Sequence, residues 1–177
     1  MRCIFFILVF TVSWALSGCG YHLTSEAQAP SLIAGKTIAI PMWRNKSYRM
    51  NLEAIMTGSL VDEFTLLRGG MVVSDEAAEL LLNGTIVNFT STAVTYTSAD
   101  LVREYRINMV VEATLTEKKS QKVLWKGTLS AGQDYPALND PNLPNRIALQ
   151  QNSEEAALRE ISRKIAQELY QKMSENF

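Results

Sequence analysis

Residue types that carry much of enzyme chemistry are scarce in this 177-residue chain. It contains two cysteines, Cys3 and Cys19, and one histidine, His22. A single imidazole supplies neither a Ser-His-Asp triad nor, without a second ligand, a metal site. The chain also has no glycine-rich phosphate loop and no Gly-x-Ser-x-Gly nucleophile elbow. We therefore expect no catalytic residue, no metal site and a protein that is not an enzyme.

An excess of charge of either sign is absent as well. The 17 Lys and Arg residues are balanced by 18 Asp and Glu residues, for a net charge of −1. Nucleic-acid-binding domains show a strong basic excess, so we expect no nucleic-acid partner. Acidic pairs such as Asp62 and Glu63 are neighbours on a predicted helix and point apart, which argues against a hydrolase. The apolar share of 47% is typical of a globular domain.

One long apolar run is present, at the amino end. Arg2 precedes Ile4–Leu16, a stretch without charge. A run of about 7–15 apolar residues after a positive start is typical of a secretory signal, and a spanning helix needs about 20. The run ends in Leu16-Ser17-Gly18-Cys19, which resembles a bacterial lipobox. This predicts a lipoprotein signal peptide over residues 1–18 and a covalent lipid on Cys19, with no other cofactor.

Two alternatives for this segment remain open. An uncleaved anchor would need a longer span, and a plain signal cut near Ala15 would leave Cys19 as a lone thiol. Lipidation accounts for both cysteines and excludes a disulfide. Gly20, in place of Asp, is typical of lipoproteins sorted to the outer membrane, so we expect the protein on its periplasmic side. The predicted organisation is a lipidated tether over 19–34 and a single domain over 35–177.

Alternating apolar residues predict a meander of antiparallel strands. The three long segments are Leu80–Tyr96, Arg103–Thr116 and Val123–Ala131, and shorter strands are expected at Lys36–Met42 and Met71–Val73. Directly after the first short strand, Trp43–Met50 is predicted as a polar turn. Because a slip by one residue would turn a strand over, the apolar sets also predict the register. The expected pairs are Leu115 with Trp125, Ala113 with Gly127, Val111 with Leu129, Phe89 with Val111 and Ala93 with Ile107, with the hairpin turn centred on Ser120.

Two helices are predicted to cover one face of this sheet. Asn51 is the expected N-cap of the first, and Gly58 within it is expected to allow close packing on the sheet. Three prolines predict a surface loop over 134–145. Asn152 and Glu155 resemble a capping box that begins the second helix. The predicted fold class is α+β, with two helices packed on one face of a mostly antiparallel four- to five-stranded sheet.

The most informative polar feature is cationic. Lys118, Lys119 and Lys122 crowd the predicted hairpin tip, Lys126 lies further along, and Arg106 begins the central strand. Lysines at a turn can serve solubility alone. On a lipid-anchored domain, however, clustered cations can bind the phosphates of anionic lipids.

Three stretches together resemble one protein family. They are Cys19-Gly20-Tyr21-His22-Leu23 at the mature start, Ile38-Ala39-Ile40-Pro41 before an amphipathic helix, and the hairpin Leu115–Trp125. In this order and spacing they resemble the LptE family of outer-membrane lipoproteins. The hairpin departs from the family at its tip, where Ser120-Gln121 stands in place of Thr-Gly.

The resemblance implies an LptE-like α/β sandwich and two partners. One is the LptD β-barrel, inside which the lipoprotein sits as a plug, and the other is lipopolysaccharide, bound during delivery to the cell surface. Polar, uncharged residues on the strands suit the polar lumen of a barrel. The lipopolysaccharide-binding residues expected here are Lys118, Lys119 and Lys122 first, then Arg106 and Lys126. The alternative is a lipid-anchored activator of a periplasmic cell-wall synthase, which a tether of about 15 residues, at most roughly 50 Å, makes less suitable.

Overall fold

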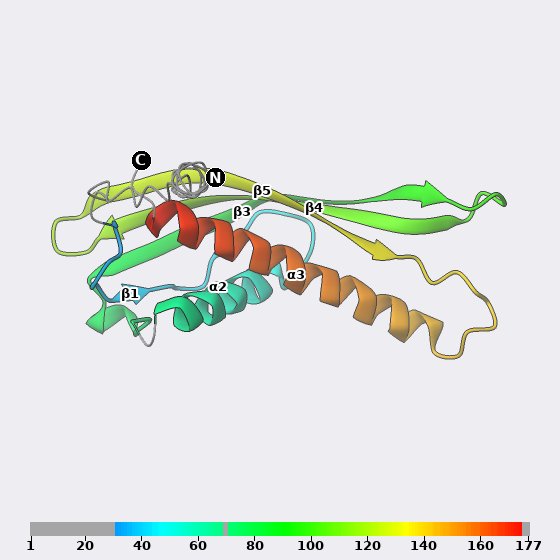
Figure 1. The fold of residues 1–177 in the computed structure, drawn as a ribbon, viewed down its shortest axis with the longest axis horizontal. Coiled ribbons are helices and arrows are strands. Elements are labelled where there is room, and N and C mark those ends of the chain that lie inside the picture. Colours follow the sequence, from blue (N-terminus) through cyan, green and yellow to red (C-terminus); the bar gives the residue numbers. More distant parts are fainter. Residues whose placement is uncertain (1–30, 69–70, 175–177) are drawn as a thin grey trace, which may run out of the picture.

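The computed structural model describes residues 31–68 and 71–174 (Figure 1). Cys19, the signal segment and most of the tether lie outside these residues. Two short strands come first, followed by a helix, a 3-10 turn, three long strands and a final helix. Their bounds are β1 Ile38–Ala39, β2 Arg44–Asn45, α2 Leu52–Arg68, η1 Asp75–Ala77, β3 Leu80–Tyr96, β4 Val102–Glu117, β5 Lys122–Pro136 and α3 Arg146–Ser174.

The sheet has the order β1-β3-β4-β5, with β2 also paired to β3. The long strands β3, β4 and β5 form the predicted antiparallel meander. Strands β1 and β2 instead run parallel to β3, pairing Ile38 with Leu80 and Arg44 with Thr85. A parallel pair needs a long crossover, and the segment that contains α2 provides it. The predicted α+β class is confirmed, and the parallel edge is an addition to it.

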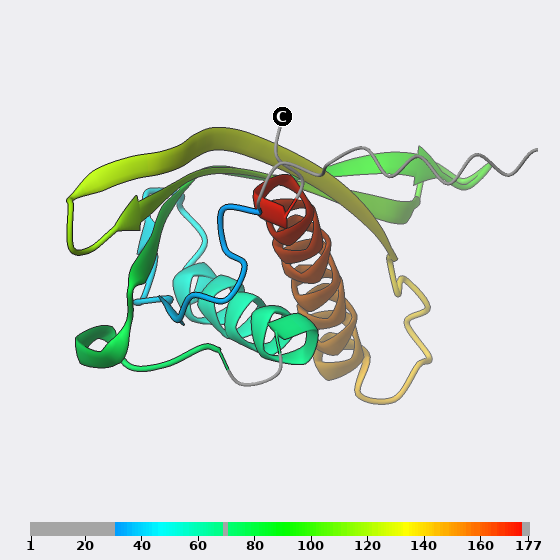
Figure 2. The same ribbon diagram turned by 60° about the vertical axis from the view of Figure 1, so that its left-hand side comes forward.

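Both helices lie on the same face of the curved sheet (Figure 2). This follows from strict alternation in β4, where every odd-numbered side chain from Ile107 to Leu115 is buried beneath the helices. The buried residues of β4 are Ile107, Met109, Val111, Ala113 and Leu115, and those predicted for α3 are Leu158, Ile161, Ile165, Leu169 and Met173. The apolar faces predicted for β4 and α3 therefore form the core.

The register of β4 with β5 is confirmed at all three predicted pairs. The register of β3 with β4 was predicted wrongly, because Val111 lies opposite Ile86 and Ile107 opposite Ser91. A bulge between Ile86 and Asn88 inserts an unpaired residue in β3, and simple alternation does not reveal it. A further shift after Leu115 places Glu117 opposite Lys122, so the turn is not centred on Ser120.

The starts of the helices differ from the sequence expectations. Asn51 precedes α2 with φ 64°, outside the extended conformation of an ordinary N-cap. Gly58 does not pack on the sheet: it is exposed, and a Cβ there would meet no atom within 4 Å. Helix α3 begins at Arg146, well before the predicted cap at Asn152.

The predicted polar turn over 43–50 contains a core residue. Trp43 is only 2% exposed, and its indole lies against Gly84 of β3. The backbone N–H of Trp43 donates to Thr57 Oγ1 at 3.0 Å, and its Nε1 donates to the Leu82 carbonyl at 3.3 Å. The indole therefore fastens the β1–β2 segment between α2 and β3.

The first described residues are docked on the end of the last helix. Ser31 Oγ donates to the Met173 carbonyl at 3.5 Å, and Ile33 is 2% exposed within the core. The end of the predicted tether is thus part of the packed domain.

Candidate functional site

The outer face of the sheet is covered by neither described helix, and polar uncharged side chains dominate it. These residues alternate with the buried ones along β3, β4 and β5 and therefore point to the opposite side. They include Asn83, Thr85, Asn88, Thr90, Thr92, Asn108, Thr114, Thr116, Thr128 and Ser130, all half-buried or exposed. Such a surface offers many hydrogen-bonding groups and little net charge.

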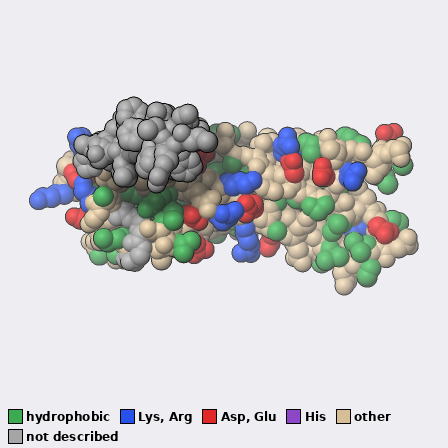
Figure 3. All heavy atoms as spheres, in the orientation of Figure 1, with side chains coloured by type: hydrophobic (Ala, Val, Ile, Leu, Met, Phe, Trp, Pro, Cys, Tyr) green, Lys and Arg blue, Asp and Glu red, His purple; other side chains and the backbone are tan. Residues whose placement is uncertain are grey.

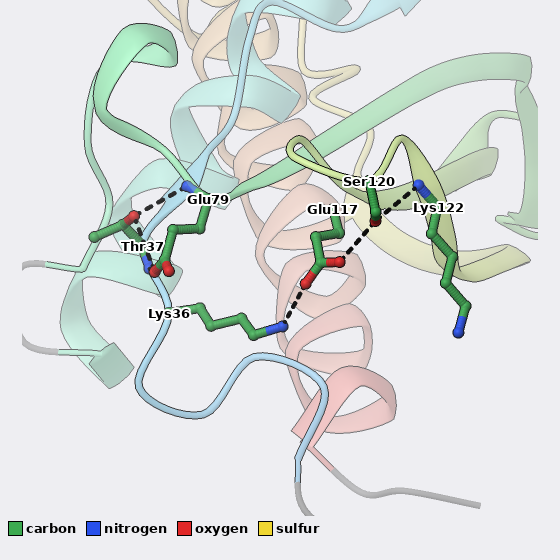
Figure 4. Close-up of polar contacts among 6 residues, drawn as sticks. All are labelled: Lys36, Thr37, Glu79, Glu117, Ser120 and Lys122. Carbon is green, nitrogen blue, oxygen red and sulfur yellow. Dashed lines mark hydrogen bonds and ion pairs between the residues drawn. The ribbon is translucent and has the colours of Figure 1, made fainter.

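Glu117 organises the β4–β5 hairpin tip (Figure 4). Lys36 Nζ lies 2.9 Å from Glu117 Oε1, and Ser120 Oγ donates to Glu117 Oε2 at 2.7 Å. The hydrogen bond from Ser120, followed by the contact with Lys36, lowers the pKa of Glu117. Because Lys36 precedes β1, the turn is held by a segment from the other edge of the sheet.

Lys118 is engaged in holding the tip against η1. Its Nζ lies 3.0 Å from Asp75 Oδ1 and also donates to the Asp75 carbonyl. Its backbone N–H donates to the Glu79 carbonyl at 2.9 Å. Glu79 in turn accepts from the Thr37 backbone N–H at 3.0 Å (Figure 4). Lys118 therefore combines a structural contact with its place at the cationic tip.

Lys119 and Lys122 are the cations that the tip presents to solvent. Both are exposed, and neither forms an ion pair with a carboxylate within residues 31–68 and 71–174. The Lys122 ammonium extends away from Glu117 in Figure 4. These two side chains are thus available to an anionic ligand without loss of an internal ion pair.

Lys126 lies further along β5, on the outer face. It lines a shallow hollow of about 400 Å³ together with Arg44 of β2 and Glu112 of β4. The sequence placed Arg44 in a turn, and only its pairing with Thr85 brings it beside Lys126. Lys36 and Arg44 thus lie near the predicted lysines without being members of the predicted set.

Arg106 lies apart from the lysines. Its Nε and Nη2 donate to the two carboxylate oxygens of Asp134 at 2.6 and 2.7 Å. This fork raises the pKa of Arg106 and lowers the pKa of Asp134. Along β4, Arg106 is roughly 40 Å from Lys118 at about 3.3 Å per residue. The structure thus brings together Lys118, Lys119 and Lys122, and it separates Arg106 from them.

The described residues form neither a metal site nor a helix that could span a membrane. Within residues 31–68 and 71–174, no group of three or more His, Cys, Asp or Glu side chains is placed to hold a metal ion. Neither described helix combines the length and apolar character that crossing a membrane requires.

Comparison with known proteins decides the family. The model of the lipopolysaccharide-assembly family, LptE, matches residues 35–173. The chain belongs to the LptE family. The resemblance seen in the sequence is thereby confirmed, and the hairpin survives the Ser120-Gln121 departure, with Gln121 taking φ 56° in the turn. No curated protein matches the chain.

Solved structures that are similar to the chain have low sequence identity to it. The hypothetical protein CT253 from Chlamydia trachomatis is 11% identical, with a TM-score of 0.52 over 78% of this chain and 97% of that one. The rare lipoprotein B from Shewanella oneidensis is 17% identical, with a TM-score of 0.48 over 74% and 92%. An uncharacterized lipoprotein B from Nitrosomonas europaea is 15% identical, with a TM-score of 0.47 over 79% and 87%.

Proposed function

We propose that this LptE-family protein is anchored to the outer membrane through a lipid on Cys19, fills and stabilises the LptD β-barrel, and binds lipopolysaccharide during its assembly at the cell surface. The observation that carries the proposal is the uncovered outer face with a cationic tip at one end. The lumen of a membrane barrel is polar, so a protein inside it needs a polar exterior. The Thr, Asn and Ser side chains of β3, β4 and β5 supply one.

The tip suits the phosphates of lipopolysaccharide. Lys119 and Lys122 are exposed ammonium groups on a turn that Glu117 and Asp75 hold in place. Ammonium groups form charge-assisted hydrogen bonds to phosphate oxygens, and such bonds are about twice as strong as neutral ones. Because the turn is already ordered, binding costs little loss of backbone freedom.

The position of the lipid anchor favours an orientation in which the hairpin tip faces the membrane. Ser31 is docked at the carboxyl end of α3, and Lys36 contacts the hairpin tip. The residues between Cys19 and Ser31 span at most roughly 40 Å when extended. A lipid on Cys19 would therefore hold the tip, rather than the opposite end of the sheet, towards the membrane.

Affinity purification tests the barrel partner. The protein is tagged after Phe177, and outer membranes are solubilised in mild detergent. We expect a large β-barrel to co-purify at about one to one. Co-purification of a murein synthase, with no barrel, would overturn this part and favour the activator of cell-wall synthesis.

Charge reversal at the tip tests lipopolysaccharide binding. The double variant Lys119→Glu/Lys122→Glu removes two cations without breaking the contacts of Lys118 or Glu117. We expect the affinity for lipopolysaccharide at physiological salt to fall at least about tenfold, since each charge-assisted bond contributes about 1.5–3 kcal/mol. The matched control Lys46→Glu/Arg159→Glu makes the same change of charge elsewhere and should leave the affinity within about twofold. Equal affinities for the two variants would remove the tip from the binding site.

A further inference from the structure

The first turns of α3 form a helix without packing into the core. The buried residues of α3 begin at Ala157, so the segment from Arg146 to Ala156 contributes none. Ile147 is 70% exposed and Leu149 is 40% exposed, and Figure 3 shows apolar side chains at the surface over this part of the molecule. The sequence pattern places the start of this helix at Asn152, six residues after its observed start at Arg146. Local disagreement of this kind is common at functional sites.

A hollow of about 360 Å³ lies between this segment and the far ends of β4 and β5. Its volume falls within the range of about 300–1,000 Å³ that is typical of small-molecule sites. Tyr105 and Tyr135 line it from the sheet, and Arg146, Gln151 and Glu154 line it from α3. The hollow therefore opens between the sheet and α3, at the opposite end of β4 from the lysine tip.

Two tyrosines form a fixed aromatic wall in this hollow. Tyr105 and Tyr135 are cross-strand partners with ring centroids 5.5 Å apart and planes inclined by 24°. The Tyr135 hydroxyl lies 3.4 Å from Ser91 Oγ, and burial raises the pKa of Tyr135. The ring planes are thus held by packing, and the phenol stays neutral as a hydrogen-bonding group.

The opposite wall is also ordered before any ligand binds. Gln150 Oε1 accepts from the Leu138 backbone N–H at 2.7 Å, and Asn139 Nδ2 donates to the Val102 carbonyl. The Ala137 backbone N–H donates to the Arg103 carbonyl at 2.9 Å. These contacts fix the loop after β5 against both the start of β4 and the start of α3.

Charged and amide groups complete the hollow. Arg49 Nη2 lies 3.2 Å from Glu154 Oε1, which leaves Glu154 Oε2 as an acceptor, and Gln151 is an exposed amide at the rim. A purely apolar ligand would leave these polar groups without partners, and a bare phosphate would meet the Glu154 carboxylate.

We propose that this hollow binds a sugar ring from the carbohydrate part of lipopolysaccharide, an assignment that rests on the proposed function. The C–H face of a sugar can pack on the electron-rich ring of the half-buried Tyr105, against which the buried Tyr135 is stacked. Its hydroxyls can donate to Glu154, accept from Arg146 and exchange hydrogen bonds with the Gln151 amide. At about 3.3 Å per residue, Tyr105 is roughly 40 Å from Lys118 along β4, so the sugar site and the phosphate-binding tip are separate.

Calorimetric titration of the purified protein tests the assignment with four probes. They are whole lipopolysaccharide, lipid A, the core oligosaccharide released from lipid A by mild acid, and a muropeptide disaccharide. We expect the core oligosaccharide to bind. Tyr105→Ala should weaken that binding at least about tenfold, whereas Tyr105→Phe, which keeps the ring, should change it less than about threefold. Tyr96→Ala, at an exposed tyrosine on β3, is the matched control and should leave it unchanged.

A second variant guards against loss of folding. Gln151→Ala changes an exposed side chain that packs nowhere in the core, and it should weaken binding of the core oligosaccharide severalfold with an unchanged melting temperature. No binding of the core oligosaccharide at millimolar concentration, with whole lipopolysaccharide still bound, would overturn the sugar site and leave the proposed function standing. Loss of both would overturn both. Preferential binding of the muropeptide disaccharide would overturn the assignment to lipopolysaccharide.

Discussion

Replacing Gly84 with alanine should destabilise the domain through Trp43 alone. A Cβ at position 84 would lie 2.4 Å from two carbons of the Trp43 indole, Cδ2 and Cε2. Carbon atoms pack best at about 3.5–4.0 Å, so the ring would have to move by more than about 1 Å. That movement breaks the 3.3 Å hydrogen bond from Trp43 Nε1 to the Leu82 carbonyl.

The expected cost follows from these two effects. Overpacking of a core side chain costs about 1–3 kcal/mol, and loss of a hydrogen bond about 0.5–1.5 kcal/mol. We therefore expect Gly84→Ala to lower the free energy of unfolding by about 2–4 kcal/mol. Trp43→Ala should lower it by about 3–5 kcal/mol. The double variant should resemble Trp43→Ala, because the clash is absent once the indole has been removed.

Urea unfolding followed by far-ultraviolet circular dichroism measures all three variants. The double-mutant cycle isolates the interaction between positions 43 and 84. We expect a coupling free energy of about 2 kcal/mol or more, with similar urea dependence for each protein. Additive costs for the two substitutions would refute the contact as the reason that glycine is needed at position 84.

Three further changes have defined outcomes. Gly58→Ala should raise the melting temperature and increase the free energy of unfolding by about 0.5–1 kcal/mol, because Gly58 is exposed on α2 and an added Cβ meets no atom within 4 Å. A lower melting temperature would contradict this. Ile165→Ala should cost about 2–5 kcal/mol in urea unfolding, because Ile165 is fully buried on α3. The pKa of Glu117 is lowered in the folded state, so its ionised form contributes stability above its usual pKa of 4.5, and this is lost as pH falls through the lowered value. The melting temperatures of the unaltered protein and Glu117→Gln should therefore converge in acid, and a gap that stays constant down to pH 2 would contradict this.

The elements that the sequence predicted well are those whose core contacts repeat regularly. Every second residue of β4 from Ile107 to Leu115 is buried, so alternation alone indicates the strand and its face. Strand β3 was found with its bounds, but its register was not, because the bulge after Ile86 interrupts the alternation. Strand β1 lies within the strand predicted at Lys36–Met42, whereas β2, in the predicted turn, has two residues, too few for any period to be visible.

The candidate sites were likewise predictable only where their residues are close in sequence. The tip lysines are close in sequence, so the hairpin prediction grouped them. Lys36 and Arg44 lie near these lysines only because β1 and β2 pair with β3, a strand more than 30 positions further along the chain. The tyrosine hollow draws Tyr105, Tyr135 and Glu154 from three elements, and its α3 segment has no core face that a periodic pattern could reveal.

The contact between the two ends of the domain bears on when the protein can become folded. Ser31 meets Met173 across 142 positions, and Ile33 needs the finished core to be buried. Synthesis begins at the amino end, so the residues around Ser31 remain without their partners until nearly the whole chain exists. Contacts of such long range form slowly because a large loop must close first. A nascent chain that lacks the last turn of α3 therefore cannot complete the packing of Ser31 and Ile33.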